Sequence, residues 1–179
     1  MKSKLFLSLL LVAVLIGCKD EQKEASKAEV EVEEASKTFD VIIDATIKKD
    51  DKIMVYYQDQ SIPFFSDDYF VEQGVIGRPE DQKVKISVPE EFVPYNIRID
   101  ISSVAGQEPI KLNKITLEYL GKSFVVESAY LKNFFTWNEY IQFDENTKML
   151  TLSKKPDGTY DPVMLTTEPL IAEIGKIIK

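Results

Sequence analysis

Aromatic and acidic side chains are concentrated in one short segment of this chain, where together they could recognise a carbohydrate. Sugars present C–H faces that stack on aromatic rings and hydroxyl groups that hydrogen-bond to carboxylates. The segment holds Tyr56, Tyr57, Phe64, Phe65, Asp67, Asp68, Tyr69 and Phe70. If its strand alternates, either Tyr56 or Tyr57 faces outward. The candidate ligand-binding residues are Tyr57, Phe65, Asp67, Asp68 and Tyr69, and the alternative is that the rings fill a core.

A second aromatic stretch runs from Phe134 to Tyr140 and contains the only tryptophan, Trp137. A ring stack flanked by Asn138 and Glu139 would suit a sugar or a protein partner equally well. Trp137 is therefore a further candidate for ligand binding. Packing of these rings into a core is the alternative.

Several residue types that carry out catalysis are scarce or missing. The chain has no histidine and a single cysteine, which excludes Ser–His–Asp triads, Cys–His dyads and His-ligated zinc. We therefore expect a non-catalytic protein with no cofactor and no bound metal. Acidic residues in turns leave calcium as an alternative. However, Asp157-Gly158 is better explained as a hairpin turn with positive φ at the glycine, and Asp144 with Asn146 as a capped turn.

The N-terminal segment predicts export and a lipid anchor. Lys2 and Lys4 precede an uncharged stretch, 5–16, that is long enough for a signal peptide and too short to span a bilayer. It ends in Leu15-Ile16-Gly17-Cys18, which resembles the lipobox of bacterial lipoproteins. The resemblance implies that residues 1–17 are removed and that Cys18 is acylated. An ordinary signal peptide followed by a chance cysteine is the alternative.

Residues 18–37 form the expected tether, which is acidic and poor in large apolar side chains. Lys19-Asp20-Glu21 resembles the signal that sends some lipoproteins to the outer face of the outer membrane. The alternative is that these three charged residues are simply part of a solvent-exposed acidic tether. We expect a protein anchored in the outer membrane by its acyl chains, and the sequence leaves open whether it faces the periplasm or the cell surface. The net charge of −8 argues against nucleic acid as a partner.

Residues 38–179 predict one all-β domain, an antiparallel two-sheet β-sandwich of jelly-roll type. Apolar residues alternate with polar ones in short segments that are separated by turn signals. A slip of this alternation near Asn113 predicts a β-bulge. Residues 170–178 predict a short C-terminal helix or a closing strand. The predicted strands cover 41–46, 53–58, 83–88, 96–102, 110–120, 124–126, 140–143, 149–152 and 163–165.

The order of several motifs resembles the jelly-roll sandwich associated with bacterial membrane glycosyltransferases, which is similar to carbohydrate-binding modules. The motifs include Val55-Tyr56-Tyr57-Gln58, Ile97-Arg98-Ile99-Asp100 and Tyr160-Asp161-Pro162-Val163. The resemblance supports the fold and transfers no binding residue, because sandwiches host many unrelated roles. We therefore expect a cell-envelope lipoprotein whose sandwich binds a ligand, with a glycan as the leading class. The alternative is a structural or assembly subunit that docks onto another envelope protein.

Overall fold

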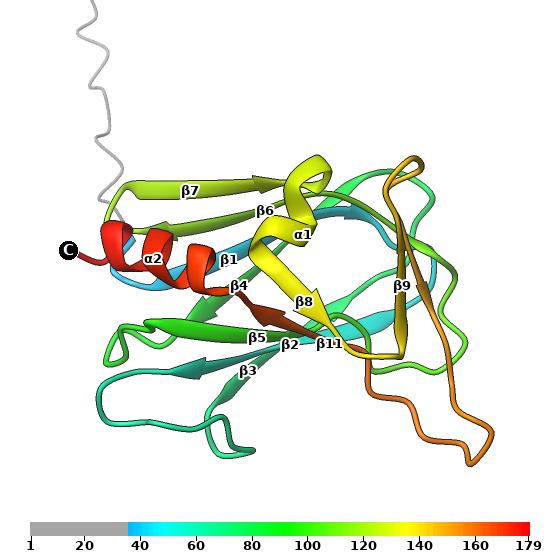
Figure 1. Ribbon diagram of the computed structural model, residues 1–179, viewed down its shortest axis with the longest axis horizontal. Helices are drawn as coiled ribbons and strands as arrows, with labels where there is room; N and C mark the ends of the chain where they lie inside the picture. The colour runs from blue at the N-terminus through cyan, green and yellow to red at the C-terminus, as the bar shows by residue number, and fades with distance from the viewer. Residues whose placement is uncertain (1–35) are drawn as a thin grey trace, which may run out of the picture. The chain divides into compact units, whose positions relative to one another are not determined.

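Two antiparallel β-sheets face each other in the computed structural model, which describes residues 36–179 (Figure 1). These residues belong to one compact unit. The prediction of a two-sheet β-sandwich is confirmed. The predicted signal peptide, the acylated Cys18 and the motif Lys19-Asp20-Glu21 lie outside the described residues.

The first sheet, sheet A, has the strand order β4-β1-β6-β10-β9, and β7 also pairs with β6. Its strands are β1 (Phe39–Thr46), β4 (Gln82–Val88), β6 (Ile110–Tyr119), β7 (Lys122–Glu127), β9 (Ile141–Asp144) and β10 (Met149–Leu152). The pairing of β1 with β6 shifts by one residue between Asp44 and Ala45, which leaves Asn113 unpaired in that ladder. The predicted β-bulge is therefore confirmed.

The second sheet, sheet B, has the strand order β3-β2-β5-β11-β8. Its strands are β2 (Asp51–Gln58), β3 (Phe70–Val75), β5 (Asn96–Asp100), β8 (Phe135–Trp137) and β11 (Val163–Thr166). Strands β3 and β8 were not expected from the sequence. Both are edge strands: β3 is largely exposed and β8 has three residues, so neither carries a clear alternation of buried and exposed positions.

Short helices connect and cover the sheets. The 3₁₀-helix η1 (Ser128–Tyr130) and helix α1 (Leu131–Phe134) follow β7, and α2 (Glu168–Ile177) ends the fold. The predicted C-terminal helix is confirmed: Pro169 lies in its first turn, and Leu170, Ile174 and Ile177 are buried. Helix α2 contacts β6, β7 and β11 and thereby covers one end of the sandwich (Figure 1).

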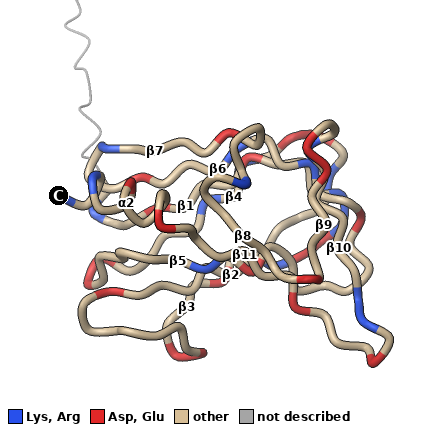
Figure 2. Tube along the Cα trace, in the orientation of Figure 1, with Lys and Arg blue, Asp and Glu red and all other residues tan. Residues whose placement is uncertain are grey.

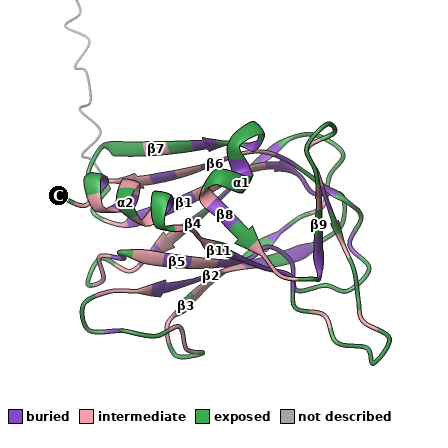
Figure 3. Cartoon of the chain, in the orientation of Figure 1, coloured by how far each residue is buried: buried purple, intermediate pink, exposed green. Residues whose placement is uncertain are grey.

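The core lies between the sheets and is formed by alternate residues of the strands (Figure 3). The predicted inward-facing sets are fully buried, as for Val41 and Ile43 of β1 and Ile97 and Ile99 of β5. The turns also follow their expected chemistry. Gly158 has φ +93°, and the Asp144 carboxylate accepts a hydrogen bond from the backbone N–H of Asn146 at 2.8 Å.

Candidate functional site

Tyr57 and Tyr69 belong to the aromatic end of the core. Tyr57 is only 3% exposed, and its ring centroid lies 5.2 Å from that of Phe92 and 6.4 Å from that of Tyr69. Tyr69 is half-buried and also contacts Phe92 edge to face. The assignment of Tyr57 as a stacking residue is therefore wrong, because neighbouring rings cover it. For Tyr57 the core-packing alternative holds.

The remaining residues predicted from the β2–β3 loop (59–69) are more accessible. Asp67 and Asp68 are exposed and Phe65 is half-buried. The Tyr56 hydroxyl lies 3.4 Å from Asp67 Oδ1, a weak hydrogen bond that turns Asp67 toward the outer face of sheet B. Asp68 makes only a backbone contact, from its N–H to Ser66 Oγ. These three residues share a loop without converging on one ligand site.

Trp137 is separated from this loop by the width of sheet B, because β8 and β3 lie at its opposite edges. Its indole is half-buried and meets the Phe143 ring edge to face, with centroids 5.6 Å apart. A shallow hollow of about 330 Å³ lies beside it, lined also by Lys132, Phe135 and Thr136. Trp137 thus joins the two sheets and is placed apart from the other predicted residues.

Tyr56, rather than Tyr57, is the outward-facing tyrosine of β2. Its ring stacks on that of Phe70, with centroids 5.1 Å apart, and the Arg98 guanidinium lies 4.5 Å above the Tyr56 ring centroid. Arg98 in turn binds both oxygens of the buried Asp100 at 2.7 Å. Burial raises the pKa of the Asp100 carboxyl, although the hydrogen bonds from Arg98 oppose this effect. Asp100 thus engages the Arg98 fork, and the cluster links side chains of β2, β3 and β5 on the outer face of sheet B.

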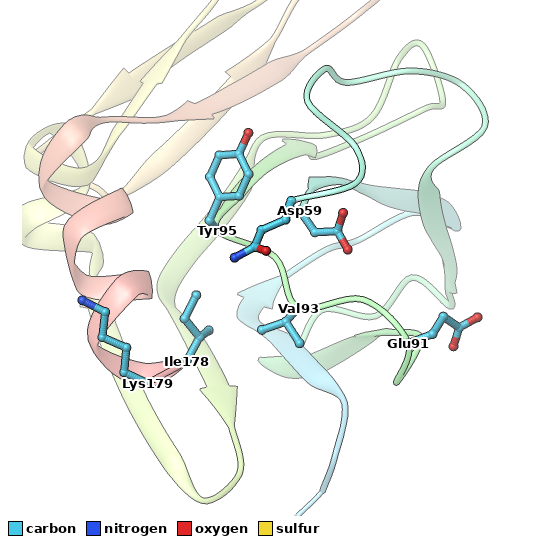
Figure 4. Close-up of a pocket in the computed structure, with 7 residues that line it drawn as sticks. Asp59, Glu91, Val93, Tyr95, Ile178 and Lys179 are labelled. Carbon is cyan, nitrogen blue, oxygen red and sulfur yellow. The ribbon is translucent and has the colours of Figure 1, made fainter.

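A hollow lies at one end of the sandwich, between the β2–β3 loop, the β4–β5 loop (89–95) and the end of α2. We call it the end hollow; it measures about 670 Å³, a size typical of small-molecule sites. In Figure 4, Val93 and Ile178 face each other across the gap, while Asp59 and Glu91 lie on the side away from α2. Its lining residues are Asp59, Gln60, Glu91, Val93, Tyr95, Ile178 and Lys179.

Local hydrogen bonds fix the two loops that build the end hollow. The Tyr95 N–H donates to the Gln58 carbonyl at 3.0 Å, which holds the β4–β5 loop against the end of β2. The Asp59 carboxylate accepts hydrogen bonds from the N–H groups of Ser61 at 2.7 Å and Ile62 at 3.0 Å, which closes the turn after β2. The hollow is therefore largely formed before a ligand enters.

The end hollow combines an aromatic face, apolar walls and carboxylates. Tyr95 is 37% exposed, so its ring is accessible for stacking. Burial raises the pKa of the neighbouring Tyr57 hydroxyl, and the negative charges of Glu91 and Asp59 raise it further. The hollow is lined by the carboxylates of Asp59 and Glu91 and by the Lys179 side chain, and the carboxylates can accept hydrogen bonds from hydroxyl groups while Val93 and Ile178 pack against C–H groups.

Sequence reasoning missed this site, although Asp59 and Gln60 belong to the loop that it singled out. The clearest available signal was Tyr95, an aromatic residue between Pro94 and the start of a predicted strand. Glu91 and Val93 are close to Tyr95 in the sequence, but Asp59 and Gln60 lie more than thirty residues before it and Ile178 and Lys179 more than eighty residues after it.

Comparisons with protein-family models, curated proteins and solved structures give no match to this chain. Within residues 36–179, no group of three or more His, Cys, Asp or Glu side chains is placed to hold a metal ion. In the same range, no helix has the length and apolar character needed to cross a bilayer.

Proposed function

We propose that this chain is a non-catalytic cell-envelope lipoprotein whose sandwich binds a glycan in the end hollow. The observation that carries this proposal is that Tyr95, an accessible ring, lines a preformed hollow together with the hydrogen-bonding side chains of Asp59, Gln60 and Glu91. A sugar ring could stack on Tyr95, while its hydroxyl groups bond to the two carboxylates and the amide.

The distribution of exposed rings supports a sugar over a broad protein interface. Among the described residues, the exposed aromatic side chains are Phe64, Phe70, Tyr95 and Tyr130, and they come from four different places in the fold. Of these four rings, Tyr95 lines the end hollow together with Asp59, Gln60 and Glu91. Docking onto another envelope protein remains the rival, and it would use the exposed Phe64 and Phe70.

The envelope location rests on the sequence of the N-terminal segment. The lipobox-like Leu15-Ile16-Gly17-Cys18 supports acylation at Cys18, and Lys19-Asp20-Glu21 supports transport to the outer membrane. Acyl chains would then anchor the protein, with each buried CH₂ contributing about 0.8 kcal/mol. The sandwich itself would be left free to meet cell-surface or environmental glycans.

The proposal is tested with the full chain in a non-ionic detergent on an array of cell-surface and dietary polysaccharides, followed by calorimetry on each hit. Loss of one stacking ring or one charged acceptor corresponds to about tenfold in affinity. Tyr95→Ala and Glu91→Gln should each weaken a hit by about that factor. Tyr130→Ala removes a tyrosine that is 60% exposed elsewhere on the surface and is the matched control, which should bind normally.

The thermal midpoint separates a binding defect from unfolding. Substitutions at exposed positions change the free energy of unfolding by about 0.5 kcal/mol or less, so all three variants should melt within about 2 °C of the wild type. Unchanged binding by Tyr95→Ala would exclude the end hollow. If no glycan binds at millimolar concentration, docking onto an envelope protein becomes the better explanation.

A further inference from the structure

We propose that a second, basic hollow binds a compact tetrahedral oxyanion, such as a phosphate or sulfate group. This hollow, which we call the edge hollow, lies between β3 and β4 and measures about 340 Å³. It includes the segment from Ile76 to Gln82 that joins the two strands. The side chains that matter to the argument are Gln73, Ile76, Arg78, Gln82, Lys83 and Lys85. The proposal is independent of glycan binding in the end hollow.

Charge is the first reason for this assignment. The lining of the edge hollow has three cationic residues and no acidic one, in a chain whose net charge is −8. Lys85 is partly neutralised by Asp40, with Nζ 2.8 Å from Oδ2. Across the described residues, no ion pair within 4.0 Å forms at Arg78 or Lys83. Two positive charges are therefore available to an anion.

Neighbouring acids are already engaged by other groups. Asp44 lies opposite Lys83 in the β1–β4 register and accepts a hydrogen bond from the Asn113 amide at 2.9 Å. Asp81, in the turn before β4, accepts a hydrogen bond from the Thr46 hydroxyl and lies 4.0 Å from Lys111 Nζ. Acidic and basic residues are interspersed over residues 36–179 (Figure 2), so a hollow whose charged lining residues are all cationic is a local exception.

The segment that carries Arg78 is held in place before any ligand binds. The N–H of Arg78 donates to the Ile47 carbonyl at 2.8 Å, and the N–H of Gly77 donates to Asp50 Oδ1 at 2.8 Å. The buried Gln82 amide donates to the Ile47 and Ile76 carbonyls at 3.2 and 3.3 Å. Because the backbone is already fixed, binding an ion here requires little additional ordering.

The strand arrangement adds hydrogen-bond donors. Strand β3 is the last strand of sheet B and β4 is the last strand of sheet A, so each has one edge without a partner strand. Free strand edges present backbone N–H groups. A tetrahedral oxyanion accepts several donors at once, and it could combine such N–H groups with Arg78 and Lys83.

A compact ion fits better than an extended anionic surface. At physiological ionic strength, charges more than about 8 Å apart are largely screened from each other. The edge hollow can thus attract a small anion locally while the whole acidic domain repels a broad negative surface. The group could be the phosphate of a lipid headgroup or the sulfate or phosphate of a substituted glycan.

The test follows backbone amide resonances of the full chain in a non-ionic detergent, titrated with inorganic phosphate and then sulfate at constant ionic strength. We expect saturable shifts at Gln73, Arg78 and Lys83, with no comparable shifts at the end hollow. In Arg78→Gln/Lys83→Gln, the dissociation constant should rise by about tenfold or more. The matched control Lys122→Gln/Lys154→Gln removes the same charge at exposed positions elsewhere and should bind as the wild type does.

Absence of a saturable shift at millimolar phosphate and sulfate, or equal binding by the two double variants, would overturn the proposal. The single variant Lys83→Gln keeps the test decisive if the double variant melts early. Two further titrations identify the source of the group: phosphatidylglycerol against phosphatidylcholine vesicles, and a sulfated against an unsulfated oligosaccharide. Binding of inorganic ions alone would make the free ion the ligand.

Discussion

The Arg98–Asp100 pair is a strong electrostatic contact made within a single strand. The Asp100 side chain is 5% exposed and the Arg98 side chain is 26% exposed, so water screens their attraction only in part. Removing one partner of such a pair leaves a buried charge without compensation, whereas replacing both by apolar side chains is often neutral. This asymmetry makes the contribution of the pair measurable.

Arg98→Met should therefore lower the free energy of unfolding by about 3 kcal/mol. Arg98→Met/Asp100→Leu should recover most of that loss, because it leaves no unpaired charge in the sheet. Urea denaturation of both variants provides the measurement. A loss below about 1 kcal/mol for the single variant would indicate that water reaches Asp100 freely.

Asp40 predicts a dependence of stability on pH. Burial alone would raise the pKa of its carboxyl, but hydrogen bonds from Lys85, Ser87 and Thr38 outweigh burial and hold the pKa below its ordinary value. A lowered pKa in the folded state means that the contribution of Asp40 is present above the unfolded pKa of about 3.9 and is lost as the pH falls through the folded pKa.

Asp40→Asn should consequently be less stable than the wild type at neutral pH, by about 1 kcal/mol, and the difference should shrink below pH of about 4. Thermal melts between neutral pH and about pH 3 would measure this convergence. A constant difference over that range would show that the loss comes from packing rather than from charge.

Two glycines illustrate how elements constrain single positions. A Cβ on Gly77 would lie 2.4 Å from the carbonyl carbon of Lys49, because the segment after β3 packs directly on the turn between β1 and β2. A Cβ on Gly74, in the exposed strand β3, would have no neighbour within 4 Å.

Gly77→Ala should destabilise the fold by about 2–3 kcal/mol, since backbone atoms must move to admit the methyl group. Gly74→Ala should be neutral or slightly stabilising, because alanine loses less backbone entropy than glycine on folding. Comparing the urea midpoints of the two variants tests the close approach. Equal stability of both would contradict it.

At the scale of single elements, the sequence predicts those strands, bulges and helices that produce a pattern within a few neighbouring residues. The inward-facing residues of β1 and β5, the bulge at Asn113 and the helix after Pro169 each arise from a pattern within a few residues. Strand β3 escaped prediction because its edge position leaves most of its side chains exposed on both faces. Alternation also could not decide whether Tyr56 or Tyr57 faces outward. The predicted ligand-binding residue is Tyr57, whose side chain is buried in the core.

At the scale of the whole molecule, the end hollow joins segments that are distant in the sequence, whereas the edge hollow lies within residues 73–85. Asp59, Tyr95 and Ile178 meet only because the sheets and α2 bring three chain segments to one end of the sandwich. The spacing of residues along the chain does not predict that these three segments come together. The sequence therefore identifies one loop that contributes to the end hollow, the β2–β3 loop, but not the residues from the other two segments.

The N-terminal segment makes a prediction for the whole protein. Mass spectrometry of membrane-extracted protein should find an acylated N-terminal Cys18, and Cys18→Ser should remove the modification and release the protein from the membrane. An intact Met1 terminus, or a cleaved chain that carries no acyl group, would contradict a lipid anchor.

The position of β1 inside sheet A, between two partner strands, also determines when the domain can fold during synthesis. This first strand pairs on one side with β4 and on the other with β6, whose residues follow about forty and seventy positions later. A chain that emerges N-terminus first must therefore carry an apolar, unpaired strand until most of the domain has arrived. Such delayed pairing exposes a strand that can aggregate, so the proposed export would favour either rapid passage or a holding chaperone.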